Sequence, residues 1–337
     1  MRCPTLAELP PPPAGKTGWP WTVETPQLPP MRPDGSPWPR ISIVTPNYNY
    51  GHFVEETIRS VLLQGYPDLE YIIIDGGSSD ESVAIIKKYE PWLAYWVSEK
   101  DRGQAHAINK GLSKVTGSIF NWINSDDLLV HGALATVGAR AKGACAVAGG
   151  VVNFGAGAPT LIANSALSPA QIISGAPETG FQQPGFWWVP ANIVTAGGID
   201  ADLNCAFDLD LLVRYLLKFP QIAYATAAVA AFRLHPDSKT SSQQKAFDGE
   251  RLAIYRKLLC NTACRSVHEH CRYRLRLHAW WDRLARIANS GRPRLLRAGE
   301  IGAAMCGDPV VRFSRLSVGA IRRILFCADE RPRPGHG

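Results

Sequence analysis

The stretch ISIVTPNYNYGHFVEETIRSVLLQGYPDLEYIIID, residues 41–75, holds two short apolar runs separated by a segment of helical periodicity. The runs ISIVT (41–45) and LEYIIID (69–75) are rich in β-branched residues, which is typical of buried strands. Between them, over residues 51–64, apolar residues recur as on one face of a helix. A strand, a helix and a strand in this order predict a βαβ unit with parallel strands.

The same alternation continues along the chain. Ser78 and Glu81 have the spacing of a capping box, which predicts the start of another helix. The elements expected after the first unit are a helix over 78–89, a strand over 94–99, a helix over 103–114 and a strand over 118–124. We therefore expect an α/β fold in which helices flank a mostly parallel, Rossmann-like sheet.

The remainder of the chain has less regular patterns. We expect a bent strand in 180–190, a helix over 207–219, a strand over 223–235 and basic helices from about residue 245. Proline is frequent before residue 40, where tryptophans indicate an extension that lies against the next domain. The predicted organisation is an extension over 1–39, an α/β domain over 40–242 and a basic helical region over 243–337.

Composition excludes several classes of protein. The 337 residues are 46% hydrophobic and 19% charged, as in an ordinary globular protein. There is no apolar run of about 18 residues that would predict a transmembrane helix. The N-terminus also lacks the apolar core of a signal peptide, so we expect a cytoplasmic protein.

Eight cysteines are scattered without paired spacing, which fits reduced thiols in the cytoplasm. Only Cys260, Cys264, His268 and Cys271 form a cluster. On one continuous helix these positions would span roughly 16 Å at about 1.5 Å per residue, too far for one tetrahedral metal. We therefore expect buried thiols on a helix face.

Polar residues lie where the predicted strands end. Thr45-Pro46-Asn47-Tyr48 ends the first strand, and Asp75, Asp101 and Asp126 follow the next three. In parallel sheets, ligands bind beyond the carboxyl ends of the strands. The adjacent carboxylates of Asp126 and Asp127 repel each other unless a cation or hydrogen-bond donors offset their charge. This edge of the sheet is therefore the candidate site.

These motifs together resemble the donor-binding half of glycosyltransferase family 2. The matching segments are 42–82, SEKDRGQAHAINKGL (98–112), NWINSDDLL (121–129), FDLDLLVRY (207–215) and FRLHPDSKTS (232–241). The resemblance covers roughly residues 40–242. It implies the GT-A fold and inverting transfer of a sugar from a nucleotide-sugar donor, usually with a divalent metal.

The resemblance also implies which residues bind the donor. They are Pro46, Tyr48, Asp75, Asp101, Arg102 and His235. Tyr48 is suited to stack on a base, and Asp75 to accept from a uracil N–H or a ribose hydroxyl. The alternatives are a packed turn tyrosine, a carboxylate placed by a helix dipole, a surface ion pair of Asp101 with Arg102, and a structural histidine.

The metal site expected from the resemblance follows the fourth strand, where the family carries a D-x-D element. Asn124 occupies the first acidic position, Asp126 the second, and Asp127 follows. Carboxylates and substrate phosphates are the ligands that Mg²⁺ and Mn²⁺ prefer. We therefore expect Asp126 and Asp127 to bind Mn²⁺ or Mg²⁺, with an ordinary acidic loop as the alternative.

An inverting transfer needs one carboxylate that takes a proton from the attacking hydroxyl. By resemblance this is the aspartate of an E-D pair at a helix start, where Phe207 replaces the glutamate and Asp208 keeps the aspartate's place. Asp210 lies well around the helix from Asp208 and is expected to serve as a first-turn helix acid. Residues 186–188, FWW, either line an acceptor groove or pack in the core.

The positive charge belongs to the C-terminal region. Residues 251–337 hold 18 Lys and Arg against 6 Asp and Glu, a net charge of +12, while the whole chain carries +7. Arginines interleave with leucines and tryptophans over 272–287, which fits either a helix packed on its own domain or peripheral contact with an anionic membrane at its inner face. The acidic remainder makes nucleic acid an unexpected partner.

The sequence thus predicts a metal-dependent inverting glycosyltransferase that transfers a sugar from a nucleoside diphosphate donor, by default a UDP-sugar, to a hydroxyl of a glycan or glycolipid. Polysaccharide synthesis at the cell surface is the expected context. Two alternatives stay open, a nucleotidyltransferase and a non-catalytic binding protein of the same fold. The former would want a basic, glycine-rich loop after the first strand, and TPNYNYGHF (45–53) has no Lys or Arg.

Overall fold

The computed structural model describes residues 1–175 and 180–288. The chain divides into two compact units between Arg251 and Leu252. This division falls inside a continuous helix, α9 (Gln244–Cys260), slightly beyond the domain boundary predicted at residue 242.

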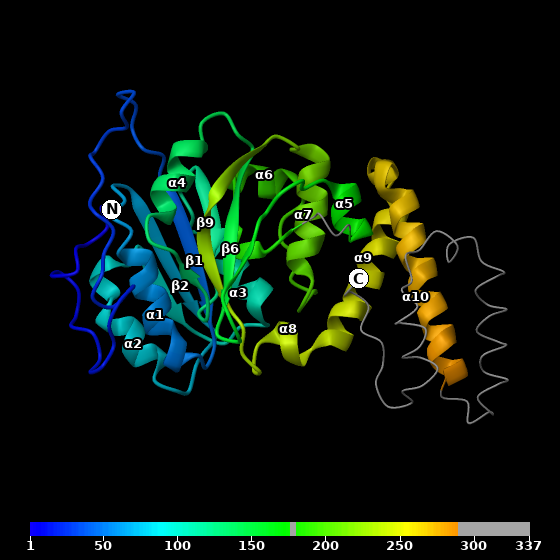
Figure 1. Cartoon of the computed structure of the whole chain (residues 1–337), viewed down its shortest axis with the longest axis horizontal. Helices are drawn as coiled ribbons and strands as arrows, with labels where there is room; N and C mark the ends of the chain where they lie inside the picture. Colours follow the sequence, from blue (N-terminus) through cyan, green and yellow to red (C-terminus); the bar gives the residue numbers. More distant parts are fainter. Residues whose placement is uncertain (176–179, 289–337) are drawn as a thin grey trace. The chain divides into compact units, whose positions relative to one another are not determined.

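A mixed sheet forms the centre of the larger unit (Figure 1). Its strands in the described residues are β1 (Ile41–Asn47), β2 (Leu69–Asp75), β3 (Tyr95–Ser98), β4 (Ile119–Trp122), β5 (Leu128–Leu129), β6 (Ala146–Phe154), β7 (Thr160–Ile162), β8 (Phe186–Trp188) and β9 (Ile222–Arg233). They lie in the order β3-β2-β1-β4-β8-β6-β9-β5, and β7 pairs with β6.

The first half of the sheet is parallel, as predicted. β1 pairs in parallel with β2 and β4, and β2 pairs in parallel with β3. The second half is mixed, because β8 runs antiparallel to β4 and β6, and β5 runs antiparallel to β9. The expectation of a mostly parallel sheet therefore holds only for the first four strands. A fully buried strand is apolar whichever way it runs, so its sequence does not show its direction.

Helices cover both faces of this sheet. Those of the larger unit are α1 (Gly51–Leu62), α2 (Ser82–Lys88), α3 (Gln104–Leu112), α4 (Ala133–Arg140), α5 (Pro169–Ser174), α6 (Pro190–Thr195), α7 (Phe207–Lys218) and α8 (Lys239–Ser242), with short 3₁₀ turns at Glu90–Trp92 and Gln183–Gly185. Figure 1 shows α1 and α2 on one side of the sheet and α3 and α7 on the other.

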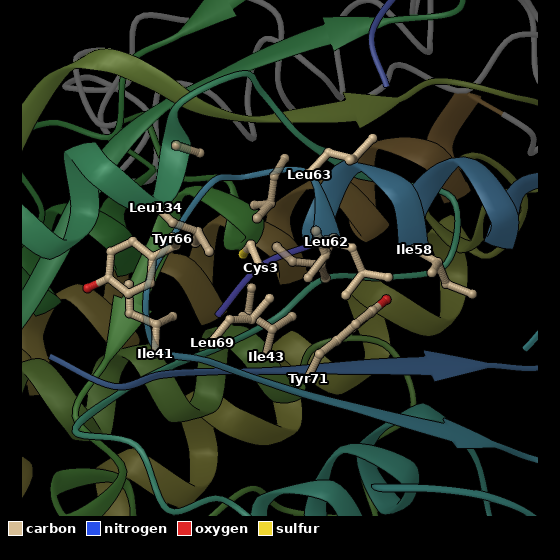
Figure 2. Close-up of a cluster of buried hydrophobic side chains, with 14 of the residues drawn as sticks. Cys3, Ile41, Ile43, Ile58, Leu62, Leu63, Tyr66, Leu69, Tyr71 and Leu134 are labelled. Atoms are coloured by element: carbon tan, nitrogen blue, oxygen red, sulfur yellow. The ribbon is translucent and has the colours of Figure 1, made fainter. Parts of the chain in front are cut away.

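Alternate residues of the central strands feed two separate cores. Ile43 and Tyr71 belong to the cluster that packs under α1, α2 and α4 (Figure 2). Val44 and Ile72 belong to the cluster that packs against α3 and α7. Because both faces are covered, the strands read as continuous apolar runs, and their polar residues are confined to the ends.

The proline-rich extension packs against the α/β domain in this structure. Its first residue pairs with β2, since the amide of Leu69 donates to the carbonyl of Met1 at 2.8 Å. Cys3 is fully buried in the first core, among side chains of α1, β1 and β2 (Figure 2). Trp19 donates from Nε1 to the carbonyl of Leu129 at 2.9 Å.

A buried arginine fastens the extension to α1. Arg59 is 0% exposed, and its guanidinium donates to the carbonyls of Pro10, Pro20 and Trp21 at 2.8–3.1 Å. The same group donates to the hydroxyl of Tyr89 at 3.2 Å. A buried cation is tolerated when its donors are satisfied, and here the irregular backbone of the extension supplies the acceptors.

The smaller unit includes α10 (His268–Ala288) and a 3₁₀ turn at Thr262–Val267. This turn interrupts the helix expected across the cysteine cluster. Cys264 and Cys271 are buried as expected, whereas Cys260 is exposed. No group of three or more metal-ligating side chains occurs within the described ranges. None of the described helices combines the length and apolar character needed to span a membrane. The rest of the basic region, 289–337, lies outside the described residues.

Candidate active site

The carboxyl ends of β1, β2 and β3 are tied together by Asp75. This side chain is 0% exposed. It accepts from Asn47 Nδ2 at 2.7 Å, from Ser98 Oγ at 2.6 Å and from the hydroxyl and amide of Ser78 at 2.5 and 2.9 Å. Burial alone would raise the pKa of Asp75, but these donors, first of all Ser78, bring it below its ordinary value. Asp75 is therefore ionised and connects the strand ends through hydrogen bonds. It has no exposed surface that a nucleotide base could contact.

Ser78 was predicted as a helix cap, and this prediction is wrong. Its hydroxyl donates to Asp75 and accepts from the amide of Asn49. The helix instead begins at Ser82, whose amide donates to Asp80 Oδ1 at 3.0 Å. The capping-box spacing is misleading here because the buried carboxylate of Asp75 is the stronger acceptor for the serine.

Tyr48 and Asp101 converge on Gly76. Tyr48 is 60% exposed at the end of β1. A Cβ atom at position 76 would lie 2.7 Å from Asp101 Oδ2 and 3.3 Å from Tyr48 Cδ2, so only glycine allows both side chains this close. Asp101 Oδ1 accepts from the amide of Gly103 at 2.8 Å. An exposed aromatic ring and a carboxylate thus lie side by side where base and ribose contacts were expected.

Two other predicted donor residues, Pro46 and Arg102, have no comparable arrangement around them. Pro46 is buried inside β1, opposite Ile74 of β2, so its side chain belongs to the sheet. Arg102 is exposed, and its backbone amide donates to His106 Nδ1 at 3.4 Å. In the described residues no ion pair joins Arg102 to Asp101, in contrast to the alternative considered from the sequence.

Asp126 and His235 meet beyond β4. Asp126 Oδ2 lies 3.0 Å from His235 Nε2, and the two side chains are 17% and 10% exposed. The ring of His235 packs against Phe53 and Tyr50, with centroid distances of 5.0 and 5.8 Å. Burial, followed by the charge of Asp126, raises the pKa of Tyr50 to about 12, so this phenol stays protonated beside the carboxylate.

Asp127 points away from this pair and into the protein. It is 1% exposed, its Oδ1 accepts from the amide of Arg233 at 3.1 Å, and its Oδ2 accepts from Asn124 Nδ2 at 3.1 Å. Burial and then the neighbouring charge of Asp126 raise the pKa of Asp127 well above its usual range. Its oxygens already have protein partners, so this geometry favours a structural role over the metal ligation expected from the sequence.

The pair of Asp126 and His235 fits a divalent ion. Two neighbouring ligands of an octahedral ion, each about 2.1 Å from the metal, lie about 3.0 Å apart. The observed separation of Oδ2 and Nε2 is 3.0 Å, which is the length of a hydrogen bond between the two side chains and also allows both atoms to ligate one ion. Only two such ligands come together, which suits an ion that takes its remaining ligands from a diphosphate and water.

Sequence reasoning missed a lysine in this region. Lys239, the first residue of α8, donates from Nζ to Gln104 Oε1 at 3.0 Å and to the carbonyl of Asn204 at 3.2 Å. Gln104 in turn donates to Asn124 Oδ1 at 2.6 Å. Gln104 and Lys239 both lie in segments that resemble family 2 motifs, SEKDRGQAHAINKGL and FRLHPDSKTS. The spacing of residues within one motif does not show which side chains of different motifs come into contact.

Asp208 lies at the start of α7, near these groups. The α7 N-terminus packs on the end of β4 through Phe207 and Trp122, whose ring centroids are 6.0 Å apart. Burial raises the pKa of Asp208 to about 6, although the amide of Leu209 donates to it at 2.7 Å. A carboxylate with a pKa near neutrality suits a general base. Asp210 instead is 1% exposed and paired with Arg214.

A glutamate from a helix distant in the sequence accepts hydrogen bonds from the backbone just before α7. Glu250, in α9, accepts from the amides of Asn204, Cys205 and Ala206 at 2.8–2.9 Å. It supplies the acidic partner of the helix N-terminus, where the family's glutamate is replaced by Phe207. No sequence signal links Glu250 to this helix, because more than forty residues separate them.

The aromatic run FWW packs in the core. Phe186, Trp187 and Trp188 are each 0% exposed, and Trp188 stacks on Trp122 with a centroid distance of 5.8 Å. Of the two alternatives drawn from the sequence, an acceptor groove or core packing, the structure supports core packing. Three successive buried side chains are possible because the strand is covered on both faces.

These features define a class of protein. A parallel βαβ half, a mixed second half and an acidic turn after the fourth strand are the arrangement of the GT-A fold. Residues 42–194 match the sequence profile described as glycosyl transferase family 2. This segment is therefore a family 2 glycosyltransferase domain.

Relatives with curated names are also glycosyltransferases. An uncharacterized glycosyltransferase of Mycobacterium tuberculosis is 38% identical over 90 residues, 26% of this chain and 34% of the relative. TuaG of Bacillus subtilis, a glycosyltransferase named for teichuronic acid biosynthesis, is 36% identical over 92 residues, 26% of this chain and 36% of the relative. Each match thus spans about a third of the relative's length.

Solved structures share the fold. The mannosyltransferase PcManGT of Pyrobaculum calidifontis, in complex with GDP-Man and Mn²⁺, superposes with a TM-score of 0.58 at 19% identity over 88% of each chain. Staphylococcus aureus TarS 1-349 in complex with UDP superposes with a TM-score of 0.52 at 16% identity over 65% of each chain. The fold is therefore GT-A, with the helical covering of both faces expected from the sequence.

Proposed function

We propose that this protein is a metal-dependent, inverting glycosyltransferase acting on a nucleoside diphosphate sugar. The acceptor would be a hydroxyl of a glycan or glycolipid in polysaccharide synthesis. Structural neighbours bind UDP, UDP-GlcNAc and GDP-Man, and a relative is named for teichuronic acid biosynthesis. We keep a UDP-sugar as the default donor, with a GDP-sugar as the alternative.

One observation carries the proposal. A carboxylate–imidazole pair suited to a divalent ion and a separate carboxylate suited to a base occur at the same edge of the sheet. Lys239 links the two places: its amine contacts the carbonyl of Asn204, just before α7, and interacts electrostatically with Asp101 and Asp126. A group that holds phosphates and a group that accepts a proton are what a single displacement requires.

Each residue then has a role in binding or proton transfer. The ring of Tyr48 stacks on the base, and Asp101 accepts from the ribose. Asp126 and His235 would hold the ion, which would offset the negative charge of the diphosphate and of the departing nucleotide. Asp208 accepts the proton of the attacking hydroxyl while the bond from the acceptor oxygen to the sugar forms and the bond from the sugar to the diphosphate breaks.

A panel of nucleoside diphosphate sugars tests the proposal. The chain is incubated with each donor and Mn²⁺, and the nucleotide products are separated by anion-exchange chromatography. Release of nucleoside diphosphate, which stops with EDTA, is the expected result. Release of pyrophosphate when the chain is instead given a sugar 1-phosphate and a nucleoside triphosphate would identify a nucleotidyltransferase. Nucleotide binding without turnover of any donor would identify a non-catalytic binding protein.

A further inference from the structure

A chain of hydrogen bonds crosses the candidate site from α8 to the turn after β4. Lys239 Nζ donates to Gln104 Oε1 at 3.0 Å, and Gln104 Nε2 donates to Asn124 Oδ1 at 2.6 Å. Asn124 Nδ2 then donates to Asp127 Oδ2 at 3.1 Å. Three segments that are far apart in the sequence therefore hold one amine in place.

The direction of these bonds explains Asn124, the departure from D-x-D. Its amide accepts from Gln104 and donates to Asp127, and a carboxylate cannot do both. An aspartate at position 124 would also add a third negative charge beside Asp126 and Asp127. The charge of Asp126 already contributes to raising the pKa of the buried Asp127. Asn124 is thus suited to orient its neighbours rather than to bind a metal.

The amine of Lys239, at the end of this series of hydrogen bonds, is a cation without a close carboxylate. In the described residues no acidic oxygen within 4.0 Å forms an ion pair with Lys239. Its contacts are two neutral oxygens, those of Gln104 and Asn204. Burial lowers its pKa, while the more distant charges of Glu250, Asp101 and Asp126 oppose this shift. A half-buried ammonium held by neutral acceptors is prepared to receive an anion.

We propose that Lys239 binds the diphosphate of the donor as a second, protein-borne cation beside the metal site of Asp126 and His235. Gln104 and Asn124 are its positioning residues. This inference rests on the proposed function, because it assigns a contact to the same donor. It follows that part of the affinity for the diphosphate persists when the metal is removed.

The experiment compares a nucleoside diphosphate with its nucleoside. UDP and uridine, and likewise GDP and guanosine, are titrated into the intact chain by isothermal calorimetry, in EDTA and in Mn²⁺. The variants are Lys239→Met, Lys239→Arg and, as a control, Lys245→Met, whose side chain is exposed six positions further on. Thermal melting checks that each variant is folded.

In EDTA, we expect Lys239→Met to weaken diphosphate binding on the order of tenfold or more, the effect of losing a hydrogen bond to a charged group. Nucleoside binding should be unchanged, Lys239→Arg should restore most of the loss, and Lys245→Met should match the wild type. Equal losses for nucleoside and diphosphate would show a structural role and overturn the inference. So would an unchanged preference for diphosphate in Lys239→Met. If the wild type bound neither nucleotide in Mn²⁺, the proposed function itself would fall.

Discussion

Asp126 Oδ2 and His235 Nε2 lie 3.0 Å apart although 109 positions separate the two residues. The register of two strands fixes this contact. Leu128 and Leu129 of β5 pair with Ala231 and Ala230 of β9 in an antiparallel ladder. The residues just before β5 must therefore lie opposite those just after β9, which brings the carboxylate to the imidazole.

Metal dependence is the first prediction. Asp126→Asn and His235→Gln should each reduce the Mn²⁺-dependent gain in donor affinity at least about tenfold, because each removes one of two protein ligands. EDTA should abolish turnover, and Mn²⁺ or Mg²⁺ should restore it. Calorimetry with and without Mn²⁺ measures the gain, and Asp202→Asn, at an exposed carboxylate, serves as the control. Full activity in EDTA would rule out the metal site.

The general base is the subject of the second prediction. Asp208→Asn should lower kcat on the order of a hundredfold or more while donor affinity changes little, because the amide cannot take a proton. Asp210→Asn should keep more activity but melt at a lower temperature, since Asp210 is paired with Arg214 in the core. The opposite ranking of the two turnover rates would transfer the role of base to Asp210.

The third prediction concerns pH. Because burial raises the pKa of Asp208 to about 6, kcat/KM should rise with pH through this value and level off above it. The same shift affects stability. Between 3.8 and about 6 the native state keeps a proton that the unfolded chain has lost, so this group makes folding less favourable as pH rises.

Asp208→Asn removes this unfavourable ionisation. The variant should therefore melt at a higher temperature than the wild type at about pH 8, and the difference should shrink toward about pH 4. Melting curves across this range measure it. A variant that is less stable than the wild type at every pH would show that Asp208 stabilises the fold instead.

The fourth prediction uses Asn124. Restoring the family's acid with Asn124→Asp should weaken metal-free binding of the nucleoside diphosphate, because it breaks the bond to Asp127 and adds a third negative charge. Asn124→Ala breaks the same series of hydrogen bonds without adding a negative charge. The affinity for the nucleoside diphosphate should therefore fall in the order Asn, Ala, Asp at position 124. Calorimetry in EDTA gives this order. Tighter Mn²⁺ binding by Asn124→Asp than by the wild type would show that position 124 is a degraded metal ligand.

The fifth prediction concerns the extension. Arg59→Met should lower the free energy of unfolding by about 3 kcal/mol or more, because several buried carbonyls lose their donor. Arg40→Met, which removes an exposed ion pair with Asp68, should cost no more than about 1 kcal/mol. Urea unfolding measures both. Equal small losses would mean that the extension contributes little to the fold.

Local pattern was enough to predict the parallel half of the fold. The predicted strand 69–75 coincides with β2, and the predicted bounds of the other early strands and helices differ from the observed ones by a few residues. The reason is that β1 and β2 are buried on both faces, so their residues must be apolar. Strand direction in the second half and the buried Arg59 depend on contacts between distant segments, which periodicity does not record.

The site was predicted by position but less well by role. Residues at strand ends were correctly identified as neighbours, since parallel strands bring their ends to one edge. Asp75 and Asp127, however, are buried and bonded to protein donors, which a sequence pattern cannot distinguish from ligand-facing carboxylates. Lys239 and Glu250 reach the site from segments after β9, and only the fold shows that they do.

The most direct test of the account follows the anomeric configuration of the sugar that the enzyme releases from its donor. In the absence of an acceptor, water takes the place of the attacking hydroxyl, and proton NMR at early times reports the first anomer formed. With the α-linked donor identified in the panel, the account predicts nucleoside diphosphate and the β-anomer from the wild type with Mn²⁺, and on the order of a hundredfold less of both from Asp208→Asn. The α-anomer as first product, or undiminished release by Asp208→Asn, would contradict a single displacement with Asp208 as its base.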